Sequence, residues 1–93
     1  MSEVIWSDTA RSDLARIDDF LLAVDSRYAE RVALQALLAG RFLSQFPSAG
    51  AIVDGETRKW TISGTEYILL YEYREDGIDI LRVHHGREDW WPR

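Results

Sequence analysis

Residues 58–90 read RKWTISGTEYILLYEYREDGIDILRVHHGREDW, and this stretch decides how the chain folds. It contains three apolar runs, at residues 60–62, 67–73 and 78–83, each rich in β-branched or aromatic side chains. Short breaks that contain glycine separate the runs, and such breaks are typical of β-hairpins. The stretch therefore predicts three antiparallel strands that form a meander.

The alternation of side chains along these strands predicts which residues share each face of the sheet. The side with more aromatic surface should face the helices, because aromatic side chains bury the largest apolar areas. This face receives Trp60, Ile62, Tyr67, Leu69, Tyr71, Tyr73, Leu81 and Val83. The opposite, open face receives Lys59, Thr61, Ile68, Leu70, Glu72, Ile78, Ile80 and Arg82. Aliphatic side chains among charged ones are typical of a protein-binding surface, unless the termini fold over them.

The N-terminal half predicts a short strand followed by two helices. Residues 4–6 form an apolar run, and Ser7 or Asp8 can cap a helix over residues 9–24. Apolar residues recur there at helical spacing, and a second helix is expected over residues 27–45. The apolar surface of this second helix is broad for a helix that needs one buried face, because it also includes Leu34, Leu37, Leu38 and Phe42.

Pro47 cannot continue the second helix, and a loop is expected from there through about residue 57. The short connection between the two helices makes them an antiparallel hairpin. We therefore predict a single α+β domain over residues 1–93. In it, a short N-terminal strand precedes a helical hairpin that packs on one face of a C-terminal antiparallel meander.

Composition narrows the classes of function. The net charge is −5, so the chain is more typical of a protein that binds another protein than of one that grips nucleic acid. It contains no cysteine, and adjacent His84 and His85 would point to opposite faces of a strand, so we expect no metal site and no cofactor. We read no signal peptide and no membrane span, and expect a cytoplasmic protein.

Several segments together point to a family. They are Arg58-Lys59-Trp60, YILLY at residues 67–71, ILRVHHGREDW at residues 80–90, and the N-terminal Ile5-Trp6-Ser7, Ala10, Asp13-Leu14 and Ile17. In this order they resemble the ParE branch of the RelE/ParE toxins, the small toxins of bacterial toxin–antitoxin operons. The resemblance covers nearly the whole chain, and its specificity lies in the ordered set rather than in one segment.

The resemblance implies a toxin that binds and inhibits DNA gyrase, and so inhibits growth and stabilises plasmids. A cognate ParD-like antitoxin would neutralise it, and the toxin would reach operator DNA only through that antitoxin. We assign candidate antitoxin-binding residues to the open face: Lys59, Thr61, Ile68, Leu70, Ile80 and Arg82. Candidate target-binding residues lie in the C-terminal tail: His85, Arg87, Asp89, Trp90 and Trp91.

Two alternatives remain open. Toxins of the RelE branch are ribosome-dependent messenger-RNA endonucleases, which need basic residues on the open face and a C-terminal Tyr or His. The match places Lys59, Thr61, Ile68 and Gly86 at the basic positions and Trp90 or Trp91 near the C-terminal Tyr. Most of the cations are absent, which argues against a ribonuclease that would use His85, Arg82 and Lys59. A degenerate toxin that serves as an antitoxin-bound scaffold or corepressor is the second alternative.

Two smaller expectations concern the end of the meander. His84 is expected to close the last strand by a hydrogen bond. Arg87 and Asp89 are expected to form a charged turn after it.

Overall fold

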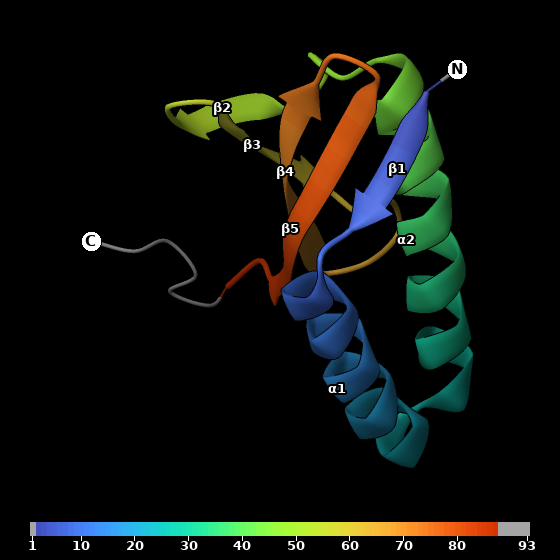
Figure 1. Cartoon of the computed structure of the whole chain (residues 1–93). Coiled ribbons are helices and arrows are strands. Elements are labelled where there is room, and N and C mark those ends of the chain that lie inside the picture. The colour runs from blue at the N-terminus through green and yellow to red at the C-terminus, as the bar shows by residue number, and fades with distance from the viewer. Residues whose placement is uncertain (1, 88–93) are drawn as a thin grey trace.

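The computed structural model describes residues 2–87, which form one α+β unit (Figure 1). Its five strands lie in one sheet in the order β1-β5-β4-β3-β2. β1 runs parallel to β5, and the other neighbouring pairs are antiparallel. The predicted N-terminal strand, helical hairpin and meander are confirmed. In chain order the elements are β1 (Glu3–Trp6), α1 (Asp8–Val24), α2 (Ser26–Gln45), β2 (Ala51–Asp54), β3 (Thr57–Thr61), β4 (Tyr67–Arg74) and β5 (Gly77–His85).

The edge strand β2 corrects the predicted loop through residue 57. Ala51 pairs with Lys59 and Ile52 with Arg58, and the chain turns back at Gly55, whose φ is 52°. A bulge between Ile52 and Asp54 interrupts this pairing. The strand is too short and irregular to show an alternating pattern of its own. It is identified as a strand only by its backbone pairing with β3.

Polar caps separate the first strand and the two helices. The Ser7 hydroxyl accepts a hydrogen bond from the backbone N–H of Ala10 and donates one to the carbonyl of Leu81. The Asp25 carboxylate accepts one from the backbone N–H of Tyr28 and caps α2. Each cap accepts a hydrogen bond from a backbone N–H group in the first turn, which has no acceptor within the helix. The hydrogen bond from Ser7 to Leu81 also holds the start of α1 against β5. α1 therefore begins beside β5 at the point where β1 ends.

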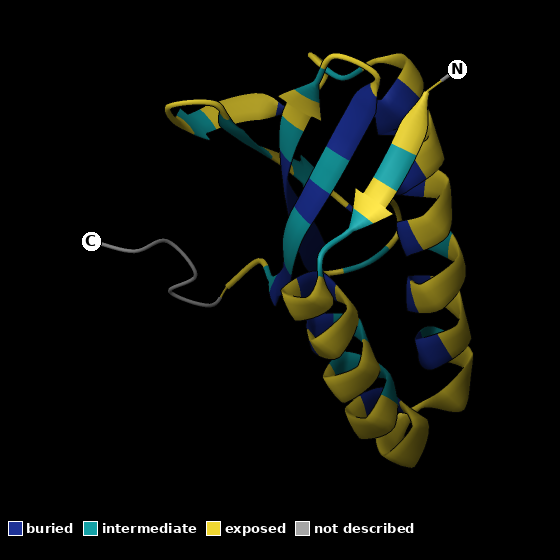
Figure 2. Ribbon diagram, viewed as in Figure 1, coloured by how far each residue is buried: buried dark blue, intermediate teal, exposed yellow. Residues whose placement is uncertain are grey.

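Both helices pack on one face of the sheet, and the hydrophobic core lies between the helices and the sheet (Figure 2). The side of α2 that faces the sheet carries small residues, among them Ala36, Ala39 and Gly40, all of them buried. A Cβ atom on Gly40 would lie 3.2 Å from Cγ1 of Val4 and 3.3 Å from Cδ1 of Ile80. Gly40 therefore allows close packing of α2 on β1 and β5.

A β-bulge in β5 overturns part of the predicted face assignment. Leu70 pairs with Arg82, but the next residue of β4, Tyr71, pairs with Ile80, so Leu81 has no cross-strand partner. The bulge reverses the alternation, and Ile78 and Ile80 therefore face the helices, fully buried, instead of the open side. Assigning Ile80 to an exposed antitoxin-binding surface was wrong for this reason.

The ends of the meander also differ from simple alternation. Tyr73 lies beside the C-terminal end of α2 rather than under it and is 56% exposed. On the open face, Ile68 and Leu70 are only 7% and 4% exposed. The open face therefore does not present the exposed aliphatic surface that the sequence predicts there.

Candidate functional site

The open face of the sheet brings together the four positions that a ribonuclease of the RelE branch would fill with basic residues. Lys59, Thr61, Ile68 and Gly86 line one shallow pocket, together with Thr65 and Glu66. Thr61 pairs with Ile68 across β3 and β4, and the backbone N–H of Gly86 donates to the carbonyl of Glu66 at 2.7 Å. Lys59 is the one cation among these lining residues, and Glu66 is the one carboxylate.

His85 lies on the opposite side of the sheet from Lys59. It pairs with Tyr67 in the ladder, and the two rings meet edge to face at 5.3 Å on the side of the helices. Its Nδ1 accepts a hydrogen bond from the backbone N–H of Arg87, and its Nε2 is 3.6 Å from a Glu66 carboxylate oxygen. His85 therefore shapes the end of β5. His84, the residue predicted to close this strand by a hydrogen bond, is buried beside Ile68 on the open face.

Arg82, a predicted partner-binding cation, is engaged by Asp13 of α1. Its Nε and Nη2 donate to the two carboxylate oxygens of Asp13 at 2.8 and 3.2 Å. Asp13 also accepts from the backbone N–H of Val83 at 3.0 Å and from Arg16 at 3.1 Å. The Asp13 side chain is 2% exposed, whereas that of Arg82 is 41% exposed. Asp13 thus fastens α1 to the edge of β5 just where β1 no longer covers it.

The surroundings of Asp13 keep its carboxylate ionised. Burial raises the pKa of Asp13, but the hydrogen bonds from Arg82 and Val83 and the positive charge of Arg82 outweigh burial, so the pKa lies below its ordinary value. The sequence contains a signal for the burial of Asp13. Asp13 lies three residues after buried Ala10 and four before Ile17, on the apolar side of the helix.

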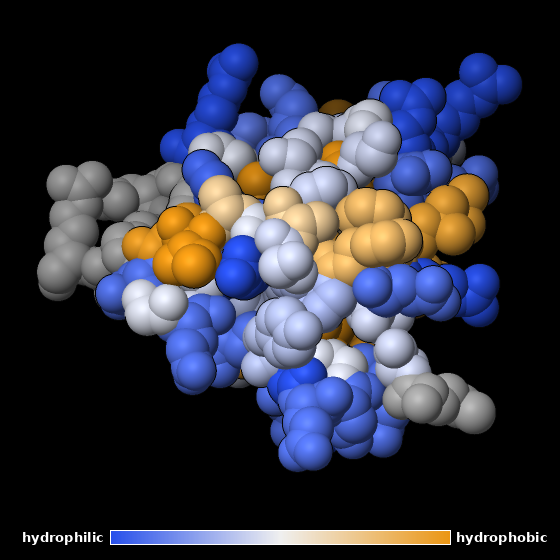
Figure 3. Space-filling view, turned by 90° about the horizontal axis from the view of Figure 1, so that it is seen from above, coloured by the Kyte–Doolittle hydropathy of each residue, from blue (hydrophilic) through white to orange (hydrophobic). Residues whose placement is uncertain are grey.

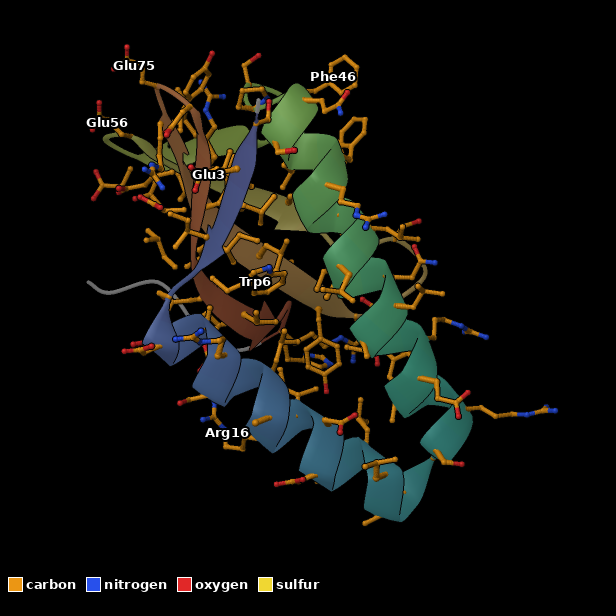
Figure 4. All side chains as sticks on the ribbon, turned by 45° about the vertical axis from the view of Figure 1, so that its right-hand side comes forward. Glu3, Trp6, Arg16, Phe46, Glu56 and Glu75 are labelled. Atoms are coloured by element: carbon orange, nitrogen blue, oxygen red, sulfur yellow. The ribbon has the colours of Figure 1, made fainter. Side chains whose placement is uncertain are left out.

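A second exposed surface, which is apolar, lies on the helical hairpin. Three neighbouring hollows run between α1, α2 and β1, and Leu37 of α2 lines all three. We call their union the hairpin groove; its apolar lining includes Val4, Trp6, Leu14, Ile17, Leu34 and Leu37. Figure 4 shows Trp6 between β1 and α2, facing this groove. The broad apolar surface of α2 that the sequence predicts is therefore real, and it faces solvent.

A second apolar area crosses the end of the molecule where α2 meets the meander (Figure 3). Phe42 stacks on Trp60 of β3 at 5.3 Å and lies 5.1 Å from Phe46, which projects outward at the end of α2 (Figure 4). Trp60 thus faces the helices as predicted, and it is half-buried. Phe46 and Ile52 are 57% and 60% exposed.

Residues 2–87 contain no group of three or more His, Cys, Asp or Glu side chains that could hold a metal ion. No helix in that part is both long and apolar enough to span a bilayer. Asp89, Trp90 and Trp91 of the predicted target-binding tail, and the Arg87–Asp89 turn, lie outside the described residues.

A model of the family described as "ParE toxin of type II toxin-antitoxin system, parDE" matches residues 4–90. The chain belongs to this family of toxins. The match runs from β1 past the end of β5, so the ParE resemblance read from the sequence is confirmed.

Two relatives extend the comparison. The chain is 26% identical over 86 residues to "Toxin RelE2" of Caulobacter vibrioides, a match that covers 92% of this chain and 97% of that protein. It is also similar to a chain of the solved structure "Chromosomal ParDE TA system from P. aeruginosa", with a TM-score of 0.77 and 20% identity. That likeness covers 91% of this chain and 96% of the other and concerns the fold alone. The fold of this ParE-family toxin is thus shared with a solved toxin–antitoxin system.

Proposed function

We propose that this ParE-family toxin acts by binding and inhibiting DNA gyrase, without catalysing a reaction itself, and that a cognate antitoxin neutralises it. The observation that carries this proposal is the pocket on the open face. A ribonuclease must stabilise charge on the scissile phosphate with positioned cations. Of the four matched positions that line this pocket, only position 59 carries a cation, Lys59. His85 faces the other side of the sheet. Family membership together with this missing set favours a toxin that acts by binding.

The hairpin groove supports an antitoxin partner. Exposed apolar grooves with polar rims are typical of protein–protein contact sites. Leu34 and Leu37 are 54% and 57% exposed there, whereas Ile68 and Leu70 of the open face are buried. We therefore move the proposed antitoxin site from the open face to the hairpin groove. The tail beyond Arg87, with Trp90 and Trp91, remains the proposed contact with the target.

Two assays with the purified chain test the mode of action. We expect a dose-dependent loss of supercoiling by purified gyrase and no new cleavage of a message on translating ribosomes, read by primer extension. Reproducible cuts in the message that disappear in Lys59→Ala or His85→Ala would instead assign ribonuclease activity. Normal supercoiling at saturating toxin would remove gyrase as the target.

A matched pair of variants tests the antitoxin site. Leu37→Asp places a charge in the hairpin groove, whereas Leu22→Asp places one on a leucine of α1 that is 52% exposed and lines none of the three hollows. We expect Leu37→Asp to weaken binding of the product of the adjacent gene and Leu22→Asp to leave it unchanged. Equal binding by both variants would place the antitoxin elsewhere.

A further inference from the structure

The outer side of α2 carries a short stripe that remains uncovered in the fold. Glu30, Leu34, Leu37 and Arg41 follow one another at spacings of four, three and four residues, which places them along one side of the helix. All four are exposed, and the outer side of α2 is open in Figure 2. Since the opposite side of α2 packs on the sheet, this helix is apolar on two sides. Apolar residues on two sides are typical of a helix that is buried on both of those sides.

We propose that two copies of this chain pair through this stripe, with their α2 helices antiparallel about a two-fold axis. In an isologous interface, a residue i that contacts j implies that j also contacts i. Leu34 and Leu37 lie equally far on either side of the point between Gln35 and Ala36, and so do Glu30 and Arg41. One register therefore places Leu34 against Leu37 of the second copy and Glu30 against Arg41, each contact occurring twice.

The charges on α2 select this arrangement over others. Neither Glu30 nor Arg41 makes a side-chain ion pair within residues 2–87, so both charges are available to a partner. A parallel pairing would bring Glu30 against Glu30 and Arg41 against Arg41, which is unfavourable. In the antiparallel register the other arginines of the helix, Arg27 and Arg31, fall level with Ser44 and Gly40 of the second copy, and neither of these residues is charged.

The second helix would also cover part of the hairpin groove. Leu34, Leu37 and Arg41 line one of its hollows together with Trp6 and Val4 of β1. A second copy and an antitoxin seated in the groove would then exclude each other. The pairing itself needs no antitoxin, and its test uses the toxin alone, so its failure would leave the proposed function untouched.

The experiment is sedimentation velocity of the purified full-length chain over a concentration series, with charge-reversal variants. We expect a monomer–dimer equilibrium. Glu30→Arg places a guanidinium opposite Arg41 of the second copy, and Arg41→Glu places a carboxylate opposite its Glu30. Because each change acts twice in a symmetric dimer, each should raise the dimer Kd about tenfold. The double variant Glu30→Arg/Arg41→Glu exchanges the charges and should return the Kd to within about threefold of the parent value.

Three results would overturn the proposal. One is a monomer at every concentration tested. Another is a dimer whose Kd is unchanged by either single reversal, because the copies would then meet elsewhere. The third is failure of the double variant to restore pairing while circular dichroism matches that of the parent. Leu22→Asp, on an exposed position away from the stripe, serves as the control and should leave the Kd unchanged.

Discussion

Replacing Asp13 by alanine tests how α1 is fastened to the sheet. The change removes a carboxylate that is 2% exposed and accepts two hydrogen bonds from Arg82 and one from the backbone N–H of Val83. Breaking a buried ion pair costs about 3–5 kcal/mol, largely because a buried group loses its partner. Arg82 is 41% exposed and can return to water, so the lower end applies. We expect a loss of about 3 kcal/mol in the free energy of unfolding.

This loss should be a large fraction of the total free energy of unfolding. A domain of this length is stable by roughly 5–14 kcal/mol, from about 0.05–0.15 kcal/mol per residue. With an m-value of about 1–1.5 kcal/mol/M, the urea midpoint should fall by about 2–3 M. Asp19→Ala changes an exposed aspartate of the same helix and should shift the free energy by less than about 0.5 kcal/mol. If Asp13→Ala unfolds at the midpoint of the parent, the fastening does not contribute to stability.

The pH dependence gives a second measurement of the same contact. The folded pKa of Asp13 lies below its ordinary value of 3.8, so its contribution to stability is complete above that value. This contribution is lost as the pH falls below 3.8 and through the folded pKa. The difference in urea midpoint between the parent and Asp13→Asn should therefore shrink as the pH is lowered through this range. A difference that stays constant would show that the ionised carboxylate is not responsible.

Three further predictions concern the loop after α2, the first strand and the tail. Tyr71→Phe removes a hydroxyl that donates to the carbonyl of Pro47 and accepts from the backbone N–H of Gly50, and should lower the free energy of unfolding by about 1–3 kcal/mol in urea titration; an unchanged midpoint would contradict it. Gly77→Ala should prevent β1 from pairing with β5, because its Cβ would lie 1.9 Å from the carbonyl oxygen of Glu3 at a φ of 156°; hydrogen exchange at residues 3–6 as slow as in the parent would refute this. A chain that ends at Glu88 should keep its circular dichroism spectrum and antitoxin binding but lose growth inhibition, whereas a folded and fully toxic truncation would remove Trp90 and Trp91 as the target contact.

Part of the fold and of the site could be predicted from neighbours along the chain. Helical spacing identified α1 and α2, and glycine-containing breaks identified the hairpins between β3, β4 and β5. Ser7 marked the start of α1 because a capping side chain and its backbone donor are close in sequence. The breadth of the apolar surface on α2 also depends only on its own sequence, although the predicted antitoxin site lay on the open face of the sheet.

The tertiary structure decided the features that depend on a distant partner. The bulge at Leu81 exists only because β5 pairs with β4. It directs the side chains of Ile78 and Ile80 toward the core. β2 is a strand only because β3 lies beside it. Asp13 and Arg82 are 69 residues apart in the chain, and no local pattern shows that one would neutralise the other. Alternation and helical periodicity describe the direction of each side chain from its own backbone, whereas register, bulges and charge pairing depend on which segments the folded chain brings together.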